Sequence, residues 1–424
     1  MVLTTALAGL IVIFLLGSLR PVNMGAIALV MAFALSALSD TSTDELRSGF
    51  PVSLLITLVG VTYLFGIAKT NGTVDRLVQL AVSAVRGRKA LIPWIVFLVA
   101  TALASIGAAS PAAVAIVAPI GIAFALQNGT SPLMNGLMAV NGAAAGSFSP
   151  VGVLGGIVLG AARQHGLEVD PVMLFGTTFG FNVLVAVGTV LIFRRHGVSP
   201  PAAEHFEDTS ASGSAGLAVA TRPRAETRNR TEQAITLAGI SAMVVAVTGF
   251  GVDTGLAALS ASVVLALLFP KTAQASTSSI AWPVVLLVCG IVTYISVLER
   301  IGVLDSLGQG VTAVGAPLLA ALVLCFIGGL VSAFASTTGI LGALVPMSIP
   351  FLLSGHIAPT ALLAALCVSS SVVDASPFST NGALIVANVP EEQRAATYKA
   401  LLLWGFALII MAPLTSWAFL VVLL

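Results

Sequence analysis

Four short polar breaks interrupt the long apolar stretches of this chain, at Ser110-Pro111, Ser149-Pro150, Thr337-Thr338 and Ser376-Pro377. In three of them serine precedes proline, as a helix N-cap precedes the first helical residue. Each break therefore predicts the start of a half-helix, whose free N–H groups and positive dipole end attract anions. The alternative is that small hydroxyl residues only let membrane helices pack closely. Four breaks in two equally spaced pairs favour an anion-binding site.

Asp374 is the strongest single candidate for a functional residue, because it lies deep inside an apolar segment. A carboxylate inside a membrane is costly and is by default a functional hypothesis. Asp374 is expected to bind Na⁺ or to carry a proton; the alternative is that it caps the half-helix that follows. Asn141 and Asn381 flank the same breaks, where an amide can bind both carboxylates and cations or simply join helices.

Two sets of site residues are predicted from these features. The first set, expected to contact the substrate, occupies the breaks and the residues beside them: Ser110, Pro111, Ser149, Pro150, Ser336, Thr337, Thr338, Ser376, Pro377, Ser379, Thr380 and Asn381. The second set, expected to couple a cation, surrounds the same breaks: Ser105, Ala109, Asn141, Ser147, Ser332 and Asp374. No catalytic residue and no cofactor is expected, apart from Na⁺ or H⁺ as the coupling ion.

An internal repeat relates the two halves of the chain. Ser105, Pro119, Phe124, Leu126, Ser149 and Pro150 recur 227 positions later as Ser332, Pro346, Phe351, Leu353, Ser376 and Pro377. An internal repeat in a very apolar chain is typical of secondary transporters, which hold their substrate where broken helices meet. At the same offset Asp374 corresponds to Ser147, so the two repeats are not chemically equal.

The composition places the chain in a lipid bilayer. Hydrophobic residues make up 58% of the chain and charged residues 8%, and the mean hydropathy is +1.07. Soluble domains carry about 25% charged residues, so a soluble fold is excluded. The net charge of +1 argues against a nucleic-acid partner. The three cysteines lie in apolar runs and predict small core residues, with no disulfide or metal framework.

The apolar stretches predict an all-α membrane protein with two inverted repeats, each of about five transmembrane helices plus one re-entrant hairpin. The expected spans are 3–19, 22–39, 50–69, 130–163 and 171–193, then 233–249, 254–270, 280–298, 358–389 and 397–422. Spans 130–163 and 358–389 are expected to be interrupted at the substrate site. The hairpins are expected at about 90–127 and 316–354, since irregular backbone at membrane depth must line a cavity or pack on protein.

The repeats are expected to occupy residues 1–193 and 233–424, joined by a polar, charged linker at 194–232. Five spans per half is an odd number, so the halves must be inverted relative to each other. Placing the linker in the cytoplasm leaves only Arg47, Arg163 and Arg300 outside, with the other fifteen Lys and Arg residues inside. This asymmetry predicts an inner-membrane protein whose central linker is cytoplasmic.

At its breaks the chain resembles the bacterial malonate/dicarboxylate carriers of the MatC type, within the divalent anion:sodium symporter group of the ion-transporter superfamily. The likeness rests on segments such as Arg20-Pro21-Val22-Asn23-Met24-Gly25 and Asp374-Ala375-Ser376-Pro377-Phe378-Ser379-Thr380-Asn381-Gly382. The wider symporter group carries Ser-Asn-Thr at each hairpin tip. Here the tips read Ala109-Ser110-Pro111 and Ser336-Thr337-Thr338, so both asparagines are missing.

The resemblance implies an elevator-type carrier of small dicarboxylates, malonate or C4 compounds, usually a homodimer in contact with membrane lipid. A cation/proton antiporter of the same superfamily is the alternative within transport. A polytopic membrane enzyme would need a positioned acid–base pair or a metal, and Asp374 is a single carboxylate. A channel is a third option, but a pair of occluding hairpins favours a carrier.

Overall fold

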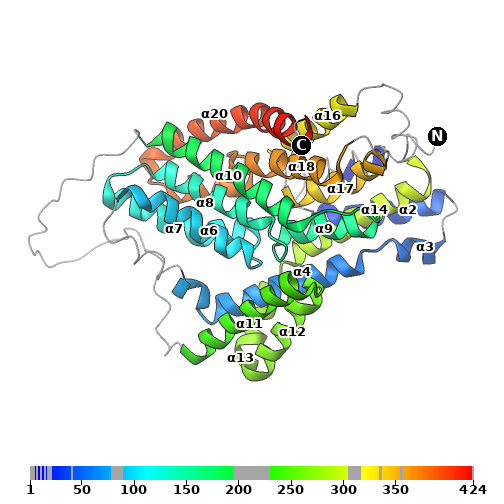
Figure 1. Ribbon diagram of the computed structural model, residues 1–424, viewed down its shortest axis with the longest axis horizontal. Helices are drawn as coiled ribbons and strands as arrows, with labels where there is room; N and C mark the ends of the chain where they lie inside the picture. Colours follow the sequence, from blue (N-terminus) through cyan, green and yellow to red (C-terminus); the bar gives the residue numbers. More distant parts are fainter. Residues whose placement is uncertain are drawn as a thin grey trace, which may run out of the picture.

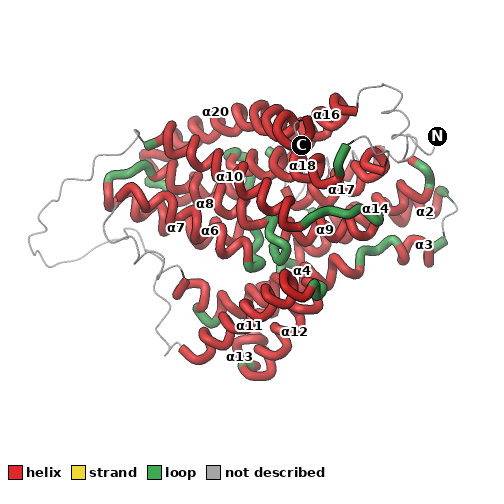
Figure 2. The backbone as a smooth tube through the Cα atoms, in the orientation of Figure 1, coloured by secondary structure: helices red, strands yellow, loops and turns green. Residues whose placement is uncertain are grey.

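The computed structural model describes residues 22–39, 42–77, 89–194, 230–303, 317–333, 337–353 and 357–422, with a few isolated positions before residue 17. All regular structure in these residues is helical (Figure 2). The predicted linker at 194–232 and the first predicted span at 3–19 lie mostly outside the described residues, so their structure stays a prediction.

The first half is built of helices α2 (Met24–Leu38), α3 (Thr43–Ser48), α4 (Val52–Thr70), α6 (Ile92–Ser105), α7 (Ser110–Asn128), α8 (Pro132–Ser147), α9 (Val153–Gln164) and α10 (Pro171–Phe193). The second half contains α11 (Arg230–Phe250), α12 (Thr254–Leu268), α13 (Pro270–Ser276), α14 (Trp282–Arg300), α16 (Pro317–Ser332), α17 (Thr337–Leu353), α18 (Pro359–Val372), α19 (Thr380–Asn388) and α20 (Glu391–Ser416). The short helices α3 and α13 are absent from the sequence prediction, and α20 begins at Glu391 where 397 is predicted.

The same order of elements occurs twice among the described residues. Helices α6 and α7 form a hairpin, α8 and α9 form an interrupted helix, and α10 follows; α16 to α20 repeat this series. Figure 2 shows short non-helical segments in the middle of the bundle, between α6 and α9. The interruptions thus lie in the protein interior, where irregular backbone can be satisfied by protein groups. The inverted orientation of the two halves stays a prediction.

Close backbone packing fixes the first hairpin against α8. A methyl group added at Gly142 would collide with the Phe97 carbonyl, and one at Gly146 with the Thr101 carbonyl. The Thr101 hydroxyl donates a hydrogen bond of 3.0 Å to the Gly142 carbonyl across this contact. Small residues at such positions allow membrane helices to approach closely, so these glycines hold the hairpin beside the interrupted helix.

Helices α11, α12 and α13 form a layer of their own, and α4 lies between this layer and the rest of the molecule (Figure 1). Helix α4 packs on α12 through Gly60, where an added methyl group would lie 2.8 Å from the Gly255 carbonyl oxygen. On its other side α4 contacts α9 and α14. Helix α4 therefore joins the outer layer to the part of the molecule that contains the breaks.

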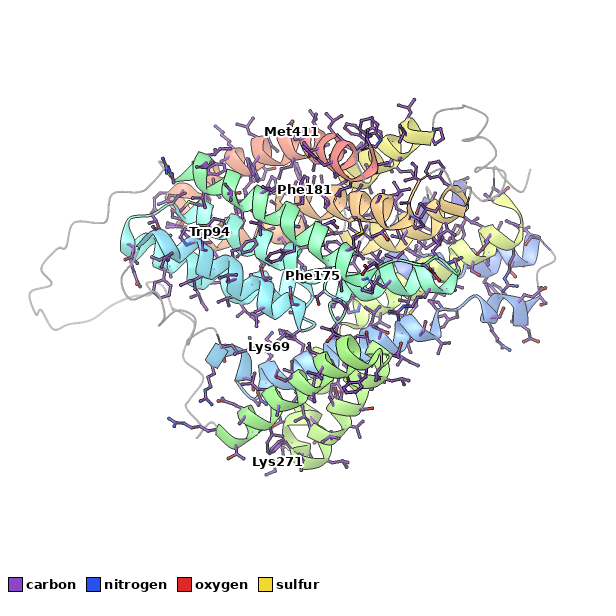
Figure 3. The ribbon with its side chains drawn as sticks, in the orientation of Figure 1. Lys69, Trp94, Phe175, Phe181, Lys271 and Met411 are labelled. Carbon is purple, nitrogen blue, oxygen red and sulfur yellow. The ribbon has the colours of Figure 1, made fainter. Side chains whose placement is uncertain are left out.

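Seven described segments are long and apolar enough to cross a membrane: Thr43–Thr70, Ser110–Asn128, Pro171–Phe193, Arg230–Phe250, Trp282–Arg300, Pro359–Asn388 and Glu391–Val422. Their outer faces expose large apolar side chains such as Leu191, Leu403 and Met411, the last of which is labelled on α20 in Figure 3. The protein is therefore an all-helical, multi-pass membrane protein, as its composition predicts.

Candidate functional site

A small cavity of about 30 Å³ lies where the starts of α7 and α17 meet the interrupted helices. Seven predicted site residues line it: Ala109, Ser110, Pro111, Thr337, Thr338, Asp374 and Thr380. The remaining lining residues are Ala144, Val153, Leu154 and Ser371. One water needs roughly 10–15 Å³ by this measure, so the cavity has room for about two waters. It is too small for a dicarboxylate in this conformation.

Asn381 joins the two repeats at this cavity. Its Nδ2 group donates one hydrogen bond of 2.9 Å to Ser110 Oγ, at the start of α7, and one of 2.8 Å to Asp374 Oδ2. An amide nitrogen has two N–H donors, and both are used here. The orientation of the amide is therefore determined, and its Oδ1 atom faces away from these two partners.

Asp374 is 8% exposed and lies in a single 3₁₀ turn, Val373–Ala375, at the end of α18. The Thr337 hydroxyl is within hydrogen-bonding reach of its carboxylate. The ion pairs among the described residues join Arg47 to Asp44 and His165 to Glu299, and neither includes Asp374. A buried carboxylate without a cationic partner is unfavourable unless it binds a cation or a proton.

The residue that caps α19 is Ser379, whose Oγ accepts a hydrogen bond of 3.1 Å from the Gly382 N–H. The alternative role of Asp374 as the cap of this half-helix is therefore wrong. Ser379 also donates to the carbonyl of Asp374, at 2.5 Å, which fixes the backbone of the carboxylate to the start of α19.

The expectation that each Ser-Pro pair opens a half-helix is wrong at two of the three sites. In both interrupted helices serine and proline begin a β-turn, closed by Gly152 N–H to Ser149 O at 2.9 Å and by Ser379 N–H to Ser376 O at 3.0 Å. Proline favours the second position of such turns as strongly as the first turn of a helix. The half-helices begin one residue after each turn, so both breaks have the same geometry.

Several predicted residues support the cavity without lining it. Ser149 Oγ donates a hydrogen bond of 2.7 Å to the Ser105 carbonyl and so joins the α8–α9 break to the end of α6. Ser332 Oγ lies 2.9 Å from Thr337 Oγ1 across the second hairpin. Pro150, Ser376 and Pro377 are not among the residues that line the cavity. Ser336 lies outside the described residues.

Two predicted cation-coupling residues make contacts of other kinds. Asn141 Nδ2 donates a hydrogen bond of 3.2 Å to Thr189 Oγ1 and thereby joins α8 to α10. Ser147 Oγ donates to the Ala143 carbonyl of its own helix, at 2.7 Å. Neither side chain lines the cavity, so the sequence prediction grouped residues that the structure separates.

Ser371 lines the cavity and was not predicted. It lies one helical turn before Asp374, and side chains three residues apart share a helix face. This spacing is the signal that could have identified it. Two buried oxygens, Ser371 Oγ on the cavity wall and Asn381 Oδ1, whose residue does not line the cavity, have no hydrogen-bond partner among the described residues. Unpartnered buried oxygens are costly, and Ser371 Oγ and the Asp374 carboxylate are hard oxygen groups of the kind that Na⁺ prefers.

The two repeats contribute different chemistry to the cavity. At the offset of 227 positions Ala144 corresponds to Ser371 and Val153 to Thr380, and all four line the cavity. At these two positions the second repeat presents hydroxyls where the first presents apolar groups. The second repeat also supplies the Asp374 carboxylate, whereas the first repeat adds the Ser110 hydroxyl to the lining.

The comparisons with known proteins agree with this architecture. Residues 1–147 match the family model described as "Dicarboxylate carrier protein MatC N-terminus". The structure is similar to that of the YdaH transporter of Alcanivorax borkumensis, with a TM-score of 0.61 and 16% sequence identity over 91% of this chain and 88% of that one. No curated protein sequence matches the chain. At this identity the structural likeness shows a shared fold.

Proposed function

We propose that the protein is a secondary active transporter that carries small dicarboxylates, malonate or C4 compounds, across the cytoplasmic membrane together with a cation. The observation that carries this proposal is the cavity at which Asp374, Asn381 and the starts of α7 and α17 meet. The match of residues 1–147 to a dicarboxylate carrier model supports the substrate class, and the likeness to a solved transporter supports transport.

The anion would be held by helix starts and hydroxyls. Helix α7 has no side-chain cap at Ala109. Pro111 carries no N–H and the Ala112 N–H bonds to the Ala109 carbonyl at 2.8 Å, so the Ser110 N–H is the donor that remains in the first turn. Helix N-termini stabilise carboxylates through such free N–H groups and through the helix dipole. The Thr337 and Thr338 hydroxyls face the same cavity from α17, so one carboxylate could bind from each hairpin once the hairpins separate.

The cation would bind on the side of the second repeat, at Asp374 and Ser371, with Asn381 orienting the carboxylate. Because the positions of the first repeat that correspond to Asp374 and Ser371 are Ser147 and Ala144, a second equivalent site is not supported. We therefore propose one coupling cation at this cavity, Na⁺ or H⁺, for each substrate molecule.

The elevator movement, the homodimer and the cytoplasmic linker belong to the same proposal. Helix α9 packs closely on α4 at Gly156 and Gly160, where added methyl groups would meet Thr57 and Leu54, so a movement of α9 along α4 would have to break this contact.

Uptake into proteoliposomes tests the proposal. Labelled malonate, succinate and citrate are offered with an inward Na⁺ gradient, with an inward proton gradient and with neither. We expect saturable dicarboxylate uptake that one gradient stimulates, with a Hill coefficient of one for that cation. Absence of gradient-stimulated uptake for all three compounds would contradict the proposed function.

The second candidate, a cation/proton antiporter, is favoured by the unpaired Asp374 alone. It predicts proton release from acid-loaded proteoliposomes when Na⁺ or K⁺ is added outside, with no need for a dicarboxylate. A pH-sensitive dye inside the vesicles separates the two functions. A membrane enzyme predicts that the labelled compound is chemically changed, which chromatography of the vesicle contents detects.

A further inference from the structure

A second cavity, of about 300 Å³, lies between α4, α9 and the start of α12. It is ten times larger than the central cavity, and its size is at the lower end of that of small-molecule pockets, roughly 300–1,000 Å³. Four uncharged polar side chains line it: Ser53, Thr57, Gln164 and Thr254. A compound of the size of a dicarboxylate fits here in the conformation described.

The charges of this cavity come from Arg163 and Asp253. Arg163 lies in the last turn of α9, and its exposed guanidinium makes no hydrogen bond or ion pair with the residues that the structure describes. Asp253 is committed to another role, because its Oδ1 accepts a hydrogen bond of 3.0 Å from the Leu256 N–H and caps α12. The available cationic donors therefore belong to Arg163.

The cavity leads to the break between α8 and α9. Pro150, inside that break, forms part of its wall, and the Pro150 carbonyl accepts a hydrogen bond of 3.3 Å from Thr254 Oγ1. Helix α9 separates the two cavities: Val153 and Leu154 in its first turn line the central one, whereas Gly160 and Arg163 line the second. The second cavity thus lies directly beside the proposed substrate site.

We propose that this cavity is an antechamber in which a carboxylate substrate binds before it reaches the central site, with Arg163 as the residue that recruits it. The inference rests on the proposed function. A guanidinium holds a carboxylate with paired, charge-assisted hydrogen bonds, and a fixed positive charge in a cleft raises the local anion concentration and the association rate. Asp253 opposes this attraction.

Kinetics in proteoliposomes test the role of Arg163. For Arg163→Gln we expect the KM for malonate to rise roughly tenfold at about 20 mM ionic strength and only slightly at about 300 mM, with kcat unchanged. Arg163→Lys should restore part of the affinity. Asp253→Asn keeps a good capping residue and should lower the KM at low ionic strength. Arg47→Gln, an exposed arginine outside the cavity, is the matched control and should behave as wild type.

Binding is tested separately from transport by cysteine protection. A cysteine replaces Ser53, an exposed residue of the cavity wall, and reacts with a negatively charged thiol reagent. The three native cysteines are buried, so background labelling is low. Malonate should slow labelling of Ser53→Cys, but not of Ser48→Cys outside the cavity, and the protection should vanish when Arg163→Gln is added.

An unchanged KM for Arg163→Gln at low ionic strength would overturn the antechamber, and so would a loss of kcat alone or labelling of Ser53→Cys that malonate does not slow. Failure of the proposed function has a different signature, because the wild-type protein would then transport no dicarboxylate under any gradient.

Discussion

At the scale of single residues, Asn381 determines the chemistry of the central cavity. Its two N–H groups are occupied by Ser110 and Asp374, and its buried oxygen has no hydrogen-bond partner among the described residues. The nitrogen therefore ties the Asp374 carboxylate to the start of α7. Sequence alone indicated that Asn381 lay near a break, but it could not distinguish a ligand from a contact between helices.

Asp374→Asn should abolish gradient-driven uptake or make uptake independent of the cation gradient. The substitution keeps the shape of the side chain and removes the charge that the cation balances, and the neutral amide can still accept from Asn381. Uptake and membrane insertion are measured side by side. Asp44→Asn, at an exposed carboxylate, is the control. If the variant keeps the normal dependence of uptake on the cation gradient, Asp374 does not couple the cation to transport.

Ser371→Ala should raise the cation concentration needed for half-maximal uptake about tenfold or less, since one neutral oxygen ligand is lost. At saturating cation the KM for substrate should remain near the wild-type value. Ser370→Ala is a closely matched control, because Ser370 is equally buried but its hydroxyl lies against Gly328 of α16. Equal effects of the two variants would mean that Ser371 acts only through packing.

At the scale of elements, much of the architecture is predictable from the sequence, because apolar length and polar interruption are strong local signals. Both hairpins and both interrupted helices occur within a few residues of their expected bounds. The exact start of each half-helix is not predictable, since Ser-Pro suits a β-turn and a helix start alike. Ser371 could not be predicted by comparing the two repeats, because its counterpart in the first repeat is an alanine.

The hairpin starts should govern substrate affinity. We expect Ser110→Leu combined with Thr337→Leu to raise the KM roughly tenfold or more, because bulky side chains keep carboxylates away from the helix N–H groups. Expression should be preserved, since both residues line a cavity. Thr248→Leu, on the exposed face of α11, controls for the added apolar volume. Wild-type affinity in the double variant would place the substrate elsewhere.

At the scale of the whole molecule, the distribution of positive charge predicts the orientation in the membrane. The Lys and Arg distribution predicts a cytoplasmic linker, so a cysteine at Ser212 should react with an impermeant thiol reagent in inverted vesicles and not in intact cells. Ser48→Cys, predicted to face outside beside Arg47, should show the reverse pattern. Buried native cysteines keep the background low. Labelling of Ser212→Cys in intact cells would show that the linker faces outside and that the predicted topology is wrong.

The hydrogen bond between Asn381 and Ser110 has a consequence for the assembly of the protein from its parts. Neither repeat contains a complete site, because the amide that orients Asp374 also requires a hydroxyl from the other half. Two copies of the first repeat would lack the carboxylate, and two copies of the second would lack Ser110. Fragments 1–212 and 213–424, made as separate chains, should therefore be inactive when expressed singly and should regain uptake only by complementation in the same membrane.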